Sequence, residues 1–228
     1  MTQNGAVIKD CSGTELDIAA NNVTVEDVLL TPNYWQMGMR FMPGYHGLVV
    51  KYVTVYFAVD EGNNCMSLEG PATLESVNLH GYCQRGIYVT TGGTTIADSY
   101  INIEDGPPSY FAPCVGIQVT ATTVSASTVV TNVTIKHDTI MTQTTPDTIG
   151  ESGPLSVGGY GSVSNLMVDD NLLQGGYYLA EMSGPGTNRS LINNEFSKQS
   201  LQKIWNVSGQ YTIARNVWEN TSTPVPGP

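Results

Sequence analysis

Three ionisable residues, Asp98, His137 and Asp170, hold the same place in three successive copies of a short repeat. A histidine between two carboxylates can take up or release a proton, which is the chemistry of a general acid or base. Enzymes that cleave polysaccharides use carboxylates in this way, either as a pair or around calcium with a basic residue. The three residues are therefore the candidate catalytic cluster, if the fold stacks the copies on one another. A polar ladder with a structural role is the alternative explanation.

The repeat is a hexad whose first and sixth residues are apolar and whose fourth is Val, Ser, Asn or Asp. Spacings of 22 to 39 residues separate eight copies, which begin at Val25, Val50, Leu74, Ile96, Ile135, Val168, Leu191 and Ile213. A ninth, weaker copy begins at Ile8 and has Cys11 in its fourth position. Self-similarity at such a period is typical of repeat architectures.

A second apolar strand lies between successive hexads and usually begins with glycine, as in residues 86–89 and 116–119. Each period then holds about three short strands separated by tight turns, and each strand must pair in parallel with its counterpart about 4.8 Å away in the next copy. The sequence predicts an all-β fold over residues 1–220, a parallel β-helix of about eight coils with three short strands per coil. Residues 221–228, rich in proline, are expected to form a tail.

The fourth and sixth positions of the hexad indicate how the coils are held together. The fourth position becomes Asn171, Asn194 and Asn216 in the last three copies. Asparagine accepts left-handed backbone geometry and bonds to neighbouring amides, so we expect a ladder of asparagines at a left-handed turn. The sixth position is apolar in all eight copies and is expected to form a core column.

Three stretches carry a resemblance to a known family: VTIKHDTI (133–140), LMVDDNLLQGGYY (166–178) and LINNEF (191–196). Over residues 7–218 the chain resembles the right-handed parallel β-helix, or pectate-lyase-like, repeat proteins. The three stretches are most similar to β-helix proteins of phages of actinobacteria, which are minor tail or other virion proteins. The resemblance implies a non-catalytic virion component on a tail or capsid. Its implied partners are other virion chains, further copies of itself or the host's surface polysaccharide.

The alternative is a polysaccharide lyase or hydrolase of the same superfamily. Asp169 and Asp170 resemble the paired aspartates of polygalacturonase-type β-helices, but the accompanying Asn-Thr-Asp, Gly-His-Gly and Arg-Ile-Lys signatures are absent from the sequence. Pectate-lyase chemistry needs a basic residue beside calcium carboxylates, and none of the four arginines stands in an acidic cluster along the chain. We therefore expect no enzyme activity, no cofactor and no metal site.

Charge and hydropathy limit the remaining partners. A formal charge of -11 would repel a phosphate backbone, which argues against nucleic-acid binding. No apolar run reaches 18 residues, so membrane insertion is not expected, and the first residues lack the pattern of a signal peptide. The virion is the expected location, with an extracellular or secreted protein as the alternative.

Aromatic residues in loops are the candidate contacts for sugar rings or protein partners, because their rings combine an apolar face with a polar edge. They are Tyr34, Trp35, Tyr45, Tyr110, Phe111 and Tyr160. The alternative is a purely structural role, in which the same residues cover the sides and ends of the solenoid.

Three cysteines precede the second strand in successive copies: Cys65, Cys83 and Cys114. Cysteines stacked in this way can bridge in an oxidising compartment, as Cys65–Cys83 or as Cys83–Cys114. Without an export signal the reduced state is the default expectation.

Overall fold

The computed structural model describes residues 1–33, 36–58, 64–104, 114–121, 129–143, 152–159, 161–199 and 203–228. Within these ranges the chain forms twenty-four β-strands and no helix, and every pair of neighbouring strands is parallel. The strands belong to one 16-stranded and one 8-stranded sheet. The prediction of an all-β fold of parallel strands is confirmed. The part of the chain that the structure describes contains no helix long and apolar enough to cross a membrane.

The 16-stranded sheet has two wings that meet at β3. The first wing contains β1 (Val7–Gly13), β3 (Thr24–Leu30), β5 (Leu48–Lys51), β8 (Ala72–Glu75), β11 (Thr94–Ala97), β14 (Val129–Lys136), β17 (Ser162–Asp169), β20 (Arg189–Ile192) and β23 (Thr212–Ala214). The second wing continues from β3 through β6 (Thr54–Phe57), β9 (Asn78–Tyr82), β12 (Tyr100–Glu104), β15 (Thr139–Gln143), β18 (Leu172–Gly175), β21 (Glu195–Phe196) and β24 (Val217–Trp218).

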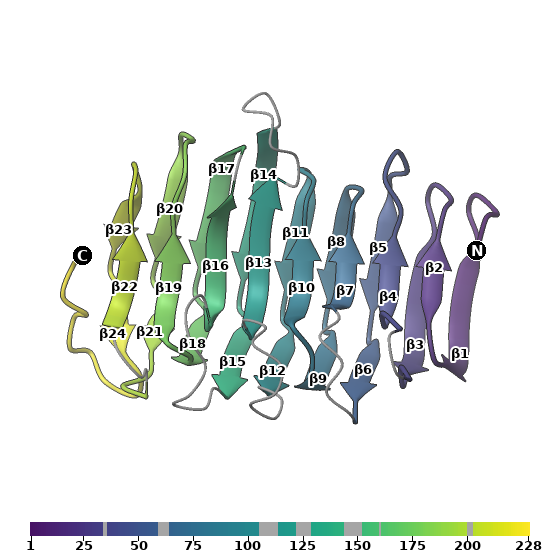
Figure 1. The fold of residues 1–228 in the computed structure, drawn as a ribbon, viewed down its shortest axis with the longest axis horizontal. Coiled ribbons are helices and arrows are strands. Elements are labelled where there is room, and N and C mark those ends of the chain that lie inside the picture. The colour runs from purple at the N-terminus through teal and green to yellow at the C-terminus, as the bar shows by residue number, and fades with distance from the viewer. Residues whose placement is uncertain are drawn as a thin grey trace.

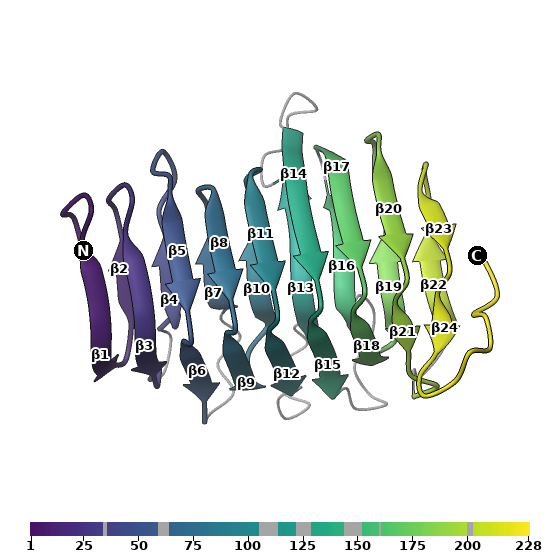
Figure 2. The ribbon, with the colours of Figure 1, turned by 180° about the vertical axis from the view of Figure 1, so that it is seen from behind.

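The 8-stranded sheet stacks the second apolar strands of the repeat. It contains β2 (Leu16–Ile18), β4 (Met39–Phe41), β7 (Asn64–Leu68), β10 (Arg85–Val89), β13 (Val115–Ala121), β16 (Gly153–Gly159), β19 (Tyr178–Met182) and β22 (Lys203–Val207). The chain visits the first wing, the second wing and this sheet in turn, and we call one such circuit a coil. Figures 1 and 2 show the coils side by side along the long axis, with the two termini at opposite ends.

The hexads stack in the predicted register. The first positions of successive copies are partners from Val25 and Val50 through to Leu191 and Ile213. The sixth positions are partners from Leu30 through to Trp218. Ile8 is the partner of Val25, so the weaker ninth copy is also part of the stack.

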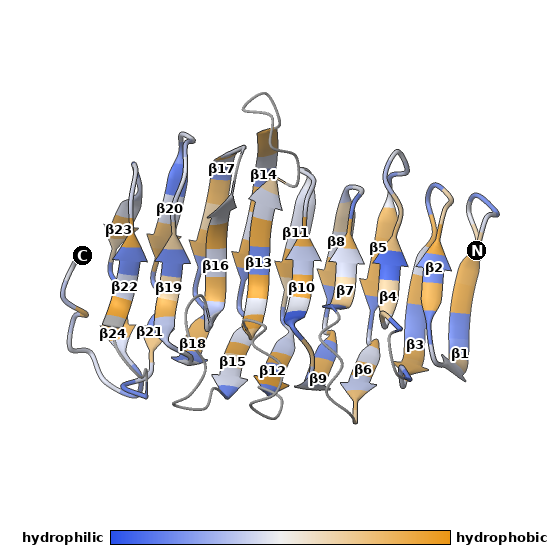
Figure 3. Cartoon of the chain, viewed as in Figure 1, coloured by the Kyte–Doolittle hydropathy of each residue, from blue (hydrophilic) through white to orange (hydrophobic). Residues whose placement is uncertain are grey.

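Alternation along each strand places the apolar side chains in one shared core. In β3, for example, Val25, Val28 and Leu30 are at most 3% exposed, whereas Leu29 points outward at 44%. Alternating side chains on a strand point to opposite faces, and Figure 3 shows the resulting bands of apolar and polar residues. All coils contribute to a single cluster of buried apolar residues.

The bend between the two wings differs from the prediction in one respect. The left-handed conformation lies at the third hexad position and not at the asparagines of the fourth; Asp98, for example, has φ 54° and His137 has φ 57°. Every third-position residue, from Asp27 to Arg215, shares this conformation. The backbone turns there with the side chain outside, so the fourth side chain points inward. Inside the stack it forms the predicted ladder, in which Asn171 N–H donates to Asn194 Oδ1 at 2.9 Å.

Cys65 and Cys83 form a disulfide with Cα atoms 6.0 Å apart, whereas Cys11 is an exposed free thiol and the buried Cys114 thiol donates to the carbonyl of Ile103 at 3.5 Å. This pairing is one of the two that we considered, and it replaces the expected reduced state. The bond joins β7 to the turn between β9 and β10, so it links neighbouring coils.

Loss of this disulfide is expected to lower the free energy of unfolding by about 3 kcal/mol. The bond joins residues 18 positions apart, and closing a loop of this length restricts the unfolded chain. Urea unfolding of the Cys65→Ala/Cys83→Ala double variant would measure the loss. Cys11→Ser removes an exposed free thiol and is the control, with a change below about 0.5 kcal/mol. Equal stability of the double variant and the wild type would show that the bond contributes nothing.

Residues 223–226 fold back along the last coil. Pro224 forms an antiparallel bridge with Val217, and Val225 N–H donates to the carbonyl of Asn216 at 2.9 Å. The Trp205 indole Nε1–H donates to the carbonyl of Pro226 at 2.6 Å, and Val225 packs against the apolar core. The proline-rich tail thus covers part of the last coils, along β24 and beside Trp205 of β22.

Candidate functional site

The structure brings the three candidate residues together at the bend between the wings. Asp98, His137 and Asp170 directly follow β11, β14 and β17, which are neighbours in the first wing. The left-handed conformation at each of the three positions turns the side chain outward. His137 Nδ1 lies 3.5 Å from Asp98 Oδ1, and His137 Nε2 lies 3.5 Å from Asp170 Oδ2. The predicted juxtaposition is therefore present.

These side chains are open to water, with exposed fractions of 49% for His137, 54% for Asp98 and 66% for Asp170. Water screens the attraction between such groups and competes for their hydrogen bonds. A general acid acts best where the substrate is held and water is excluded. The arrangement is suited to a proton-dependent link between coils, and a catalytic role for it stays a prediction.

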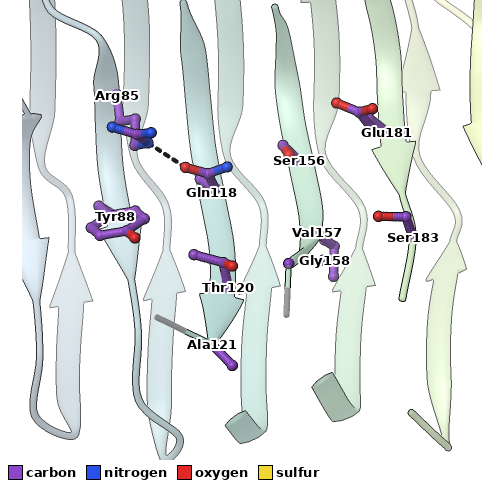
Figure 4. A pocket seen from close by; sticks show the side chains of 11 residues that line it. Arg85, Tyr88, Gln118, Thr120, Ala121, Ser156, Val157, Gly158, Glu181 and Ser183 are labelled. Carbon is purple, nitrogen blue, oxygen red and sulfur yellow. Dashed lines mark hydrogen bonds between the residues drawn. The ribbon is translucent and has the colours of Figure 1, made fainter. Parts of the chain in front are cut away.

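A second candidate site lies on the outer face of the 8-stranded sheet, where a groove crosses four neighbouring strands. Figure 4 shows the residues that line it on β10, β13 and β16 and at the end of β19. One outward residue of each strand stands in a registered row: Tyr88, Gln118, Ser156 and Glu181. The cavity volume is about 310 Å³. With strands about 4.8 Å apart, the row is roughly 14 Å long.

One end of the groove combines a cation, an aromatic ring and an amide. The Arg85 guanidinium lies 4.9 Å from the centre of the Tyr88 ring and donates to Gln118, as drawn in Figure 4. It also donates to Gln84 Oε1 at 2.7 Å and to Asn64 Oδ1 at 3.3 Å. These contacts fix the orientation of the guanidinium plane. Burial raises the pKa of the Tyr88 phenol, with Arg85 acting in the opposite direction, so the phenol keeps its proton at neutral pH.

The other end carries a carboxylate, and small residues keep the middle open. Glu181 Oε1 accepts from Asn206 Nδ2 at 2.9 Å. Between the ends, a side chain on Gly158 would collide with the hydroxyl of Ser183, and one on Gly159 with the hydroxyl of Thr120. Both glycines also have positive φ, at 153° and 106°, which other residues rarely adopt. The groove therefore presents hydroxyl, amide and carboxylate groups beside one aromatic ring.

Five of the six aromatic residues proposed from the sequence lie outside the described residues: Tyr34, Trp35, Tyr110, Phe111 and Tyr160. Tyr45 is half-buried and packs against the core, which is the structural role considered as the alternative. Three exposed tyrosines lie instead on the second wing or in the bend before it: Tyr52 at 56%, Tyr56 at 41% and Tyr100 at 43%.

Sequence reasoning missed the groove, although a signal for it was present. The apolar residues of the second strands identify these strands, but the residues between them, such as Tyr88, Gln118 and Ser156, show no common type that marks a site. Placing Ile87, Ile117 and Leu155 in register would have revealed that outward row.

Among the described residues, no group of three or more His, Cys, Asp or Glu side chains is arranged to hold a metal ion. Comparison of the chain with protein-family models, with curated proteins and with solved structures finds no match.

Proposed function

We propose that this chain is a right-handed parallel β-helix that serves as a non-catalytic virion component, on a phage tail or capsid, and binds the host's surface polysaccharide. The observation that carries the proposal is the groove across β10, β13, β16 and β19. An aromatic face beside fixed polar groups is the usual composition of a site for small polar ligands. Sugars present both an apolar ring face and many hydroxyls, and the groove offers a partner to each.

A rigid support favours such binding. Apart from Ser183, which directly follows β19, the groove residues stand on paired strands, so little conformational freedom is lost when a ligand binds. The Cys65–Cys83 disulfide is consistent with a location outside the reducing cytoplasm, either on a particle or as a secreted protein.

Tyr88→Ala is expected to weaken binding of fragmented envelope polysaccharide from an actinobacterium by about tenfold, or about 1.4 kcal/mol, measured by calorimetry. The reason is the loss of the ring face at the cationic end of the groove. Tyr100→Ala is the matched control, because it removes an exposed tyrosine from the second wing. Unchanged melting temperatures would exclude unfolding as the cause. Equal effects of the two variants, or no binding by the wild type, would contradict the groove as the glycan site.

The virion assignment has its own test, which is mass spectrometry of purified phage particles that carry this gene. A constant copy number of the chain per particle would support it, and absence from the particles would contradict it.

The second candidate function, polysaccharide cleavage, is favoured by the two 3.5 Å contacts of His137 with Asp98 and Asp170. An enzyme using this cluster would release reducing or unsaturated ends from polysaccharide, and His137→Ala and Asp170→Ala would each abolish the release. No release by the wild type would leave the binding protein as the remaining proposal.

A further inference from the structure

One carboxyl group interrupts the ladder at the fourth hexad position. Its consecutive members are Ser99, Asp138, Asn171, Asn194 and Asn216, all at most 4% exposed. Along the ladder, each backbone N–H donates to a side-chain oxygen in the next coil. Ser99 N–H donates to Asp138 Oδ1 at 2.7 Å, and Asp138 N–H donates to Asn171 Oδ1 at 2.9 Å.

The second atom of each asparagine amide is surrounded by acceptors. Asn171 Nδ2 donates to Asn194 Oδ1 at 2.9 Å and to the carbonyl of Ile135 at 3.1 Å. Asn216 Nδ2 donates in the same way to the carbonyl of Leu191 at 2.9 Å. In Asp138 the corresponding atom is Oδ2, which is buried and has no hydrogen-bond partner. A protonated Oδ2 could donate as the asparagine nitrogens do, whereas an ionised Oδ2 would be a buried charge without a hydrogen bond of its own.

The electrostatic surroundings favour the protonated form. Burial raises the pKa of Asp138 to about 7 and the charge of Asp98 adds to the rise, although hydrogen bonds from Ser99 and Lys136 act in the opposite direction. The strands β11, β14 and β17 and the bends after them carry the other titratable groups near Asp138. Asp98, His137 and Asp170 follow these strands on the outer side of the bend, and Lys136 and Asp169 end β14 and β17 on the outward face.

A second set of contacts lies on the outer side of the same bend. His137 lies 3.5 Å from both Asp98 and Asp170 and forms ion pairs with them only when its ring is protonated. A protonated His137 ring would therefore join the coils of β11, β14 and β17 from the outside.

We propose that Asp138, with Asp98, His137 and Asp170 outside it, forms an acid-tightened clasp across three successive coils. Proton uptake by Asp138 and His137 joins these coils more firmly, and proton loss loosens this part of the stack.

Proton linkage determines whether the clasp becomes stronger or weaker as the pH rises. The carboxyl of Asp138 holds its proton up to about pH 7 in the folded chain, and to about pH 3.8 when unfolded. Between these values the folded state binds one more proton, so the clasp is complete below about pH 4 and is lost as the pH rises to about 7. Within this pH window, each pH unit changes the ratio of molecules with the clasp formed to molecules with the clasp open by about tenfold.

Amide hydrogen exchange of the full chain tests the proposal at pH 5 and pH 8, after correction for intrinsic exchange rates. In the wild type, the protection of the Ser99 and Asp138 amides is expected to fall at least tenfold from pH 5 to pH 8. The Asn194 amide, which donates to Asn216 Oδ1 at 2.9 Å, is the internal control and should change little. An equal response at all three amides would show a global effect and overturn the clasp.

Asp138→Asn supplies a permanent donor at the inner position, so the Ser99 amide should lose most of its pH response and keep only the smaller part that comes from His137. The outer contribution should disappear in His137→Gln, leaving a smaller response. If Asp138→Asn shows the same pH dependence of amide protection as the wild type, Asp138 has no role in the clasp. If His137→Gln shows the wild-type pH dependence, His137 has no role in it. Should Asp138→Asn not fold, carbon NMR titration of the wild-type carboxyl decides: a midpoint near neutrality supports the clasp, and one near pH 4 overturns it.

Discussion

Asn194→Asp is expected to lower the free energy of unfolding by about 3–5 kcal/mol at pH 7.5. Asn194 is fully buried, and its Nδ2 donates to Asn216 Oδ1 at 3.1 Å and to the carbonyls of Val168 and Ile192 at 3.1 and 2.8 Å. Aspartate would place an oxygen among these three acceptors. Urea unfolding measures the loss, which should shrink below pH 5 as the new carboxyl takes up a proton.

The control for this substitution is Asn188→Asp. Asn188 is exposed, and its Nδ2 donates to Asn165 Oδ1 at 3.1 Å in a second, outer row of asparagines. The same chemical change in water should cost less than about 1 kcal/mol. A cost of similar size at both positions would mean that burial of the inner ladder is not the cause.

Arg189→Met is expected to destabilise the chain by about 2–4 kcal/mol. Arg189 is 2% exposed, and its guanidinium donates to the carbonyls of Gln210 at 3.1 Å and Gly184 at 3.0 Å, and to the Tyr211 hydroxyl at 2.8 Å. It also lies 3.9 Å from the centre of the Tyr211 ring. Methionine fills part of the space but leaves these acceptors without their donor.

Thermal and urea unfolding of Arg189→Met, Arg189→Lys and Arg215→Ala would separate the contributions. Lysine keeps the charge but loses the planar fork and the stacking on the ring, so we expect an intermediate loss. Arg215 is exposed and donates to Asn193 Oδ1 at 2.6 Å, and its removal should cost less than about 1 kcal/mol. If Arg189→Met also lowered the free energy of unfolding by less than about 1 kcal/mol, the role assigned to the buried arginine would be contradicted.

The stacking of the chain was predictable because each coil repeats the same constraint. An apolar residue at the first and sixth hexad positions has to meet its counterpart in the next coil, so Ile96 and Ile135 could be aligned across 39 residues. This register then placed Asp98, His137 and Asp170 side by side. The inward direction of the fourth side chain was also predictable, since stacked asparagines need partners.

The parts that were not predictable depend on local geometry without a repeated signal. Which hexad residue adopts positive φ could not be read from a column that includes Tyr52, His137 and Arg215, residues with no shared preference for that conformation. The groove depends on how Gly158 and Gly159 approach the neighbouring strands. The choice of Cys65–Cys83 over Cys83–Cys114 depends on side-chain direction, which spacing alone does not determine.

The tail that folds back over the last coil has a consequence for how far the architecture can grow. Identical layers have no intrinsic length limit, and an uncovered final layer would be a template for indefinite fibre growth. Pro224, Val225 and Pro226 of the same chain lie against this last layer and form hydrogen bonds or a bridge with it, next to β24 and Trp205. At the opposite end, β1 and β2 are the terminal strands of their stacks. The two ends of the described stack therefore differ: strand β24 in the last coil is bridged by residues of its own chain, whereas β1 and β2 carry no strand on their outer side.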